Sequence, residues 1–151
     1  MSPTALRLDV LALGEPMIEF NQTTPGRPGF LQGFGGDTSN AAIAAARSGA
    51  RAGYWTRLGD DAFGGMLRAL WACEGVDASA VATDPSAHTA VYFVTHGPDG
   101  HAFSYLRAGS AASRMGPADV PLELVRSARI VQASGISLAI SASACDAVLH
   151  A

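Results

Sequence analysis

The chain has 151 residues, of which 48% are hydrophobic and 15% charged, and its formal net charge is −3. That length and apolar content are enough for one buried core, and they argue against intrinsic disorder. The acidic balance argues against a nucleic-acid-binding protein, which would carry a basic patch. The longest uncharged run, Ile130–Cys145, is too short and too polar to span a bilayer, and the N-terminal stretch is a poor signal peptide.

The cysteines and histidines give no sign of a metal site or a disulfide scaffold. Cys73 and Cys145 stand far apart in the chain, and no Cys or His residues have the spacing of zinc ligands. Two cysteines in a chain that can build a core are typical of a reducing compartment. We therefore expect a cytoplasmic protein without membrane contact and without a metal site of its own.

The first fifty residues predict a strand, an irregular β-rich segment and a helix. The apolar run Leu8–Leu13 predicts a buried parallel strand, and residues 15–36 predict short strands joined by a turn near 24–29. The Ala-rich segment 40–48 predicts a helix. The residues that can cap its N-terminus are Asp37, Thr38 and Ser39, and Gly49 is the candidate for its C-terminal end.

The next segment repeats the strand-and-helix order. Residues 52–58 predict a strand, and Asp60 or Asp61 can cap the helix that follows and ends at Gly75. Its apolar positions recur at helical spacing and form one stripe, Phe63, Met66, Leu67, Leu70 and Trp71. This alternation favours an α/β fold.

The second half begins with a β-hairpin and returns to the same alternation. Residues 76–87 have room for a short strand, and Thr89–Thr95 and Ala102–Ala108 flank the turn residues 97–100. Further on, the sequence predicts a short helical piece at 110–115, a helix at 117–128, a strand at 129–134 ending in Gly135, and a helix at 141–150. The last strand has no later strand to pair with, which predicts an open sheet edge.

The segment Gly33–Asn40 is one candidate binding site. Glycines such as Gly35 and Gly36 let a backbone approach a ligand, and the start of a helix offers free N–H groups. Asn40 can both donate to and accept from a sugar hydroxyl. The alternative is a tight turn with an ordinary helix cap. The segment has no Walker A ending and no dinucleotide-binding glycine pattern.

The hairpin carries a second candidate site. Tyr105 and Arg107 lie two residues apart on one strand and therefore share a face, with Tyr92 on the neighbouring strand. An arginine beside tyrosine hydroxyls is suited to holding a carboxylate or phosphate. The alternative is a solvated arginine with aromatic cross-strand packing. Glu15 and Glu19, after the first strand, fit a ligand contact and a cap or salt bridge equally well.

Several motifs together resemble the ribokinase-like, or PfkB-type, carbohydrate kinases. Within that family, the Tyr-x-Arg-x-Gly-Ser-Ala stretch at 105–111 points to the group that acts on 2-keto-3-deoxygluconate. The other matching blocks are Leu-Gly-Glu-Pro at 13–16, Gly-Gly-Asp-Thr-Ser-Asn-Ala-Ala at 35–42, Arg-Leu-Gly-Asp-Asp-Ala-Phe-Gly at 57–64, Glu-Gly-Val-Asp at 74–77 and Thr-Ala-Val-Tyr at 89–92.

The resemblance implies a doubly wound α/β sheet with a small β-lid made of residues 15–36 and 88–108. It also implies that residues 1–151 all belong to the N-terminal part of one domain. It implies an ATP- and Mg²⁺-dependent transfer of phosphate to a sugar, and a possible homodimer through the lid. The sugar-binding residues that it implies are Gly35, Gly36, Asn40, Tyr92, Tyr105 and Arg107, with Arg107 facing the carboxylate of a sugar acid.

The chain departs from the family in one respect. The family's catalytic Asp lies in a Gly-Ala-Gly-Asp motif of the C-terminal, ATP-binding half, and this motif is absent here. We therefore expect the truncated chain to supply the substrate-binding half, with no catalytic residue of its own, and to be inactive alone. Two alternatives are a kinase of a neutral sugar such as fructose or ribose, and a non-catalytic sugar-binding module.

Overall fold

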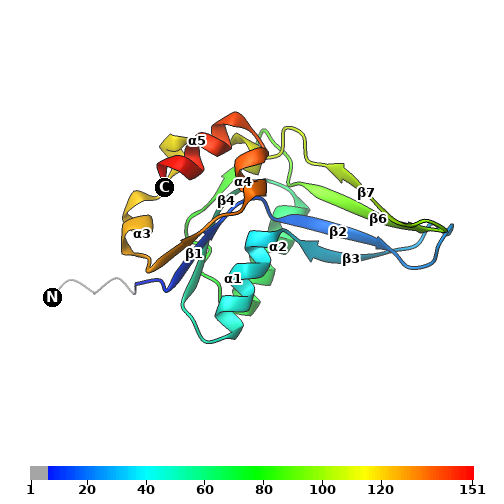
Figure 1. The fold of residues 1–151 in the computed structure, drawn as a ribbon, viewed down its shortest axis with the longest axis horizontal. Coiled ribbons are helices and arrows are strands. Elements are labelled where there is room, and N and C mark those ends of the chain that lie inside the picture. The colour runs from blue at the N-terminus through cyan, green and yellow to red at the C-terminus, as the bar shows by residue number, and fades with distance from the viewer. Residues whose placement is uncertain (1–6) are drawn as a thin grey trace.

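Two four-stranded sheets organise residues 7–151, the part of the chain that the computed structural model describes (Figure 1). The main sheet has the order β5-β4-β1-β8 and is parallel throughout. Its strands are β1 (Val10–Leu13), β4 (Ala52–Gly59), β5 (Val81–Asp84) and β8 (Ile130–Gln132). The predicted α/β class is confirmed.

The second sheet, which we call the lid, has the order β3-β2-β6-β7. It joins two antiparallel hairpins through a parallel pairing of β2 with β6. Its strands are β2 (Met17–Gln22), β3 (Phe30–Gly35), β6 (Val91–Gly97) and β7 (Gly100–Leu106). The lid extends away from the main sheet as a thin layer (Figure 1). All four strands fall within the two segments predicted for it.

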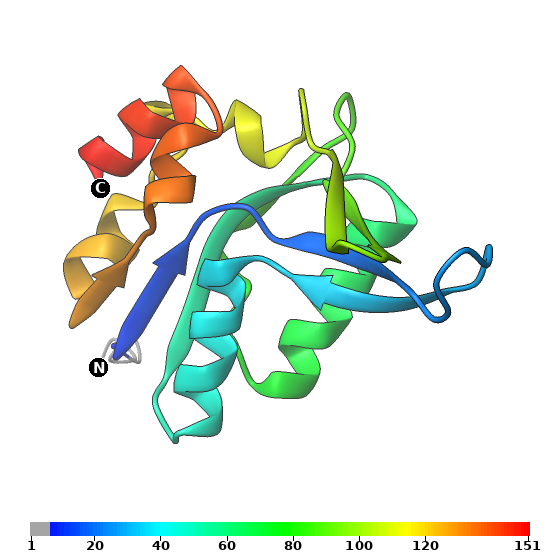
Figure 2. The ribbon, with the colours of Figure 1, turned by 45° about the vertical axis from the view of Figure 1, so that its right-hand side comes forward.

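Helices cover both faces of the main sheet (Figure 2). On one face, α1 (Asp37–Arg47) and α2 (Ala62–Glu74) share a hydrophobic core with Ala12 of β1 and Tyr54 of β4. On the other, Leu11 and Leu13 pack against α5 and the segments before it. These later elements are the 3₁₀ turns η1 (Ala112–Arg114) and η2 (Pro117–Asp119) and the helices α3 (Leu122–Ser127), α4 (Gly135–Ala139) and α5 (Ala142–His150). Burial on both faces explains the uninterrupted apolar sequence of β1.

Helix α2 has the predicted stripe and the predicted ends. Leu67 and Trp71 are fully buried, whereas Met66 is exposed because it lies at the edge of the stripe. Asp61 caps the helix by accepting a hydrogen bond from the Gly64 N–H, and its second oxygen accepts one from the Thr89 N–H at 2.7 Å. The cap therefore also ties α2 to the segment that leads into the lid.

The start of α1 differs from the prediction. The helix begins at Asp37, and its N-cap is Gly36, which makes no side-chain cap and has φ of 108°. A Cβ on Gly36 would lie 2.7 Å from the carbonyl oxygen of Glu15, so a tight crossing against β1 fixes a glycine here. Thr38 and the two residues beside it are therefore not the caps, and the Thr38 hydroxyl instead bonds to Tyr54.

Three predictions for the second half need correction. The hairpin strands lie at 91–97 and 100–106, because the turn closes directly from Gly97 to Gly100. The predicted helix at 117–128 is split into η2 and α3 at Pro121, which has no N–H to continue it. Gly135 begins α4 rather than ending a strand, with Ser134 as the cap.

The open sheet edge is confirmed: β8 lies at the end of the strand order, and Ile130 is 58% exposed. In residues 7–151, none of the helices has the length and apolar character needed to cross a bilayer.

Candidate functional site

The candidate site lies where the main sheet changes its direction of winding. The helices after β1 and β4 cover one face, and those around β8 cover the other, so the change falls between β1 and β8. In open α/β sheets, ligands bind beyond the carboxyl ends of the strands at this position. Glu15 follows β1 directly, and Ser134 follows β8 before α4. The lid also leaves the main sheet here.

One face of the lid carries a row of polar and aromatic side chains. The strand registers place Glu19 beside Tyr92, and Tyr92 opposite Tyr105. The two tyrosine rings stack with centroids 5.7 Å apart, and the Tyr92 hydroxyl donates a hydrogen bond to Glu19. Burial and the nearby Glu19 carboxylate raise the pKa of Tyr92, so its hydroxyl stays protonated at neutral pH. The tyrosines therefore form a fixed surface with the Glu19 carboxylate at one end.

Arg107 lies at the other end of this row. Its guanidinium carbon is 5.8 Å from the centroid of the Tyr105 ring, so the predicted sharing of a face is confirmed. One nitrogen, Nη2, lies 2.5 Å from Oε2 of Glu15, a side chain that is only 1% exposed. The two atoms form an ion pair without hydrogen-bond alignment. The Arg107 side chain makes no other polar contact with residues 7–151, so most of its N–H donors face no protein acceptor.

The Glu15 carboxylate has a second partner, the Ser110 hydroxyl, which donates to Oε1 at 2.5 Å. Burial raises the pKa of Glu15, and the Ser110 hydrogen bond and the Arg107 charge oppose this rise. The sequence left Glu15 between a ligand contact and a salt bridge, and the structure shows the salt bridge. The partners could not be named from the sequence, because Ser110 lies 95 positions away.

The glycine segment meets the same surface. A Cβ on Gly35 would lie 2.5 Å from the Tyr92 ring, so the glycine leaves the space that the ring occupies. Gly36 packs against the backbone of Glu15. Asn40 lies in the first turn of α1, where its N–H donates to the Gly36 carbonyl, but its side chain is exposed. The structure thus brings five of the six predicted residues into one connected set and leaves the Asn40 side chain beside it.

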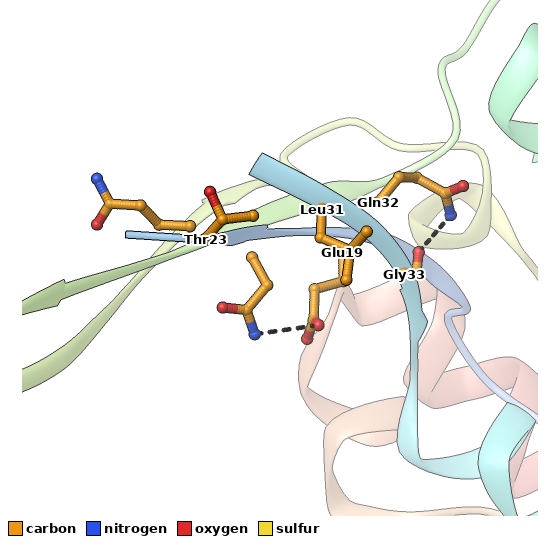
Figure 3. A pocket seen from close by; sticks show the side chains of 7 residues that line it. Glu19, Thr23, Leu31, Gln32 and Gly33 are labelled. Atoms are coloured by element: carbon orange, nitrogen blue, oxygen red, sulfur yellow. Dashed lines mark hydrogen bonds between the residues drawn. The ribbon is translucent and has the colours of Figure 1, made fainter. Parts of the chain in front are cut away.

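Two pockets flank this set. The first, of about 360 Å³, lies on the lid (Figure 3), where the Asn21 amide donates to Glu19. The second, of about 400 Å³, lies between Arg107 and α4, with Ile136 and Ile140 as apolar walls. The first pocket thus has an anionic group and the second a cationic one. The residues that line the first pocket are Glu19, Asn21, Gln22, Thr23, Leu31, Gln32 and Gly33.

Comparison with known proteins identifies the family. The model of the pfkB family of carbohydrate kinases matches residues 7–151. The chain belongs to this family. It is 41% identical over 153 residues to a 2-dehydro-3-deoxygluconokinase of Thermoproteus tenax, and 39% identical over 135 residues to fructokinase-2 of Solanum habrochaites. These alignments cover 97% and 85% of this chain but 47% and 41% of the relatives, so the chain spans about half their length.

Solved structures of pfkB kinases have the same fold, which is ribokinase-like. The PfkB protein of Polaromonas sp. JS666 superposes with a TM-score of 0.89 at 38% identity, over 94% of this chain and 50% of that one. A fructokinase of Xylella fastidiosa with bound ATP superposes with a TM-score of 0.68 at 29% identity, over 74% of this chain and 37% of that one. The structural match, like the sequence match, is to about half of a kinase.

Proposed function

We propose that this pfkB chain supplies the sugar-binding half of a cytoplasmic, ATP-dependent kinase of a sugar acid, most simply 2-keto-3-deoxygluconate. The observation that carries the proposal is Arg107, a partly exposed guanidinium at the carboxyl side of the sheet with free N–H donors. A planar guanidinium matches a carboxylate with two parallel hydrogen bonds. Glu19, at the other end of the tyrosine row, is an acceptor for sugar hydroxyls.

A kinase of a neutral sugar such as fructose is the second candidate. It is favoured by Glu15, which already gives Arg107 a counter-ion, so the pair has no net charge to attract an acid. The likeness to a fructokinase at 39% identity supports it as well. A non-catalytic sugar-binding module has no observation of its own in its favour.

No site for the nucleotide or its Mg²⁺ is assigned to residues 7–151. Residues 7–151 contain no group of three or more His, Cys, Asp or Glu side chains that could hold a metal ion. The Gly-Ala-Gly-Asp sequence is also absent from the chain. No step of phosphoryl transfer is therefore assigned to these residues. We expect no ATP-dependent phosphorylation of either sugar by the 151-residue chain alone, and phosphorylated sugar in a coupled assay would contradict this.

A calorimetric titration of ketodeoxygluconate and fructose into the folded chain tests the substrate. Arg107→Lys keeps a counter-ion for Glu15 but loses the planar fork, so it should weaken binding of the acid about tenfold and leave fructose unchanged. Arg47→Lys, in the exposed pair with Glu74, is the matched control and should change neither. Equal affinity for both sugars, or equal losses in Arg107→Lys, would favour the neutral sugar. A folded chain that binds neither would contradict both candidates.

We also propose that two copies associate through the lid. Leu31 and Phe103 are 68% and 50% exposed on the lid face that carries Tyr105, and Leu106 is 59% exposed on the opposite face. Sedimentation velocity over a range of concentrations tests this, and a monomer at all concentrations would contradict it.

A further inference from the structure

Glu15 lies where the main sheet and the lid are joined. It follows the last residues of β1, and its carbonyl oxygen is covered by Gly36, at the crossing from β3 into α1. Its carboxylate contacts Arg107 and Ser110, which follow the last strand of the lid. Through its backbone and its side chain together, Glu15 thus connects three of the segments that pass between the two sheets.

The guanidinium of Arg107 is held from two sides. The Glu15 carboxylate contacts its Nη2 atom, and the Tyr105 ring lies under its face. The carboxylate is itself fixed, because it is almost fully buried and accepts the Ser110 hydrogen bond. By contrast, Arg107 is 29% exposed, so its remaining N–H groups can reach a ligand.

We propose that Glu15 is a positioning residue that fixes the orientation of the Arg107 guanidinium before the sugar binds. A guanidinium has five N–H donors, and Glu15 contacts it only at Nη2, which leaves the donors on Nη1 and Nε for a ligand carboxylate. Holding a long side chain in its bound conformation removes an entropic cost of binding. The ligand part of this inference rests on the proposed function, because it takes Arg107 as the contact for a sugar acid.

The orientation of Arg107 can be measured without any ligand. NMR relaxation of the arginine Nε–Hε groups, with the Arg107 signal assigned by its loss in Arg107→Lys, should show a rigid side chain in the wild type. Glu15→Gln should make it as mobile as the exposed arginines. Glu74→Gln is the matched control, because it breaks a Glu–Arg contact of the same 2.5 Å length and should release Arg47 only. An Arg107 signal that is mobile in the wild type, or equally rigid in Glu15→Gln, would overturn the proposal.

A second variant keeps the test decisive if Glu15→Gln does not fold. Ser110→Ala leaves the carboxylate in place but removes its other partner, so the mobility of Arg107 should increase, although less than in Glu15→Gln. Unchanged mobility in a folded Ser110→Ala protein, together with an unfolded Glu15→Gln protein, would assign Glu15 a structural role and overturn the proposal.

Calorimetry then separates positioning from simple charge balance. Loss of positioning should weaken binding of ketodeoxygluconate by about tenfold in Glu15→Gln and leave fructose within about twofold. If Glu15 only competes for the charge of Arg107, the acid should bind more tightly in Glu15→Gln, which would overturn the proposal. A wild type that binds neither sugar would contradict the proposed function, while the relaxation measurement would still decide the role of Glu15.

Discussion

Removal of Arg107 should destabilise the fold because it leaves a buried carboxylate without its counter-ion. The Glu15 side chain is 1% exposed and that of Arg107 is 29% exposed. Breaking a fully buried ion pair by removing one partner costs about 3–5 kcal/mol. Water reaches the Arg107 side of this pair, so we expect about 2 kcal/mol for Arg107→Ala. For a chain of this size that corresponds to a fall in Tm of roughly 4–8 °C.

The pH dependence of this loss gives the stronger test. Burial raises the pKa of Glu15 above its ordinary value of 4.5 in the folded state, with the Ser110 and Arg107 contacts opposing the rise. When folding raises the pKa of a carboxyl group, the stability of the fold is highest below the pKa of the unfolded state. That stability is lost as the pH rises through the pKa of the folded state. Arg107→Ala raises the folded pKa further. The destabilisation caused by Arg107→Ala should therefore be largest at neutral pH, where Glu15 is charged, and should shrink as the pH falls toward about 5.

Thermal unfolding followed by far-UV circular dichroism at both pH values measures the effect. The double variant Glu15→Gln/Arg107→Ala should recover most of the loss, because it has no buried charge and the glutamine oxygen can still accept the Ser110 hydrogen bond. The reasoning would be refuted by a loss that is the same at both pH values and that Glu15→Gln does not reverse.

Two further predictions concern the joint between the sheets. Gly35→Ala should displace the Tyr92 ring, lower the free energy of unfolding by about 1–3 kcal/mol and weaken sugar binding. Denaturant unfolding measures the change in stability. Gly65→Ala is the control, because a Cβ there meets nothing within 4 Å and should not destabilise the protein. Asp61→Ala should cost about 1–2 kcal/mol, because two N–H groups lose their acceptor. Burial opposes the shift in the Asp61 pKa, but the hydrogen bonds from Thr89 and Gly64 outweigh it and lower the value. The loss of stability in Asp61→Ala should therefore be complete above pH 3.8 and disappear as the pH falls through the pKa of Asp61 in the folded state. A loss of stability that persists in acid would count against this.

The sequence predicted those elements whose signal is local and repeated. The stripe of α2, with Leu67 and Trp71 on the buried side, and the hairpin around the turn at 97–100 both depend on residues close together in the chain. The predictions failed where a distant contact outweighs local preference. Gly36 caps α1 in place of Asp37 because the backbone of Glu15 covers it, and Gly135 begins α4 although a glycine is more typical of an ending.

The same distinction holds for the candidate site. The period of a strand predicted that Tyr105 and Arg107 share a face; β7 ends at Leu106, one residue earlier, but the guanidinium still lies over the Tyr105 ring. Two other contacts, the Tyr92 ring beside Gly35 and the ion pair of Glu15 with Arg107, depend on how distant segments meet where the lid leaves the main sheet. Periodicity contains no information on such pairs. The family resemblance named Arg107 but not Glu15, the contact that holds it.

The polarity of the lid face bears on which sugar fits it. Glu19 presents carboxylate oxygens at one end of the tyrosine row, and Arg107 presents N–H donors at the other. A sugar hydroxyl can donate at the first end, whereas a carboxylate is repelled there and attracted at the second. On the proposed function, a sugar acid has one favoured direction along this face, while a neutral sugar gains little from the polarity. A fixed direction is what a kinase requires of its substrate, because one hydroxyl has to be held at the position where the phosphoryl group arrives.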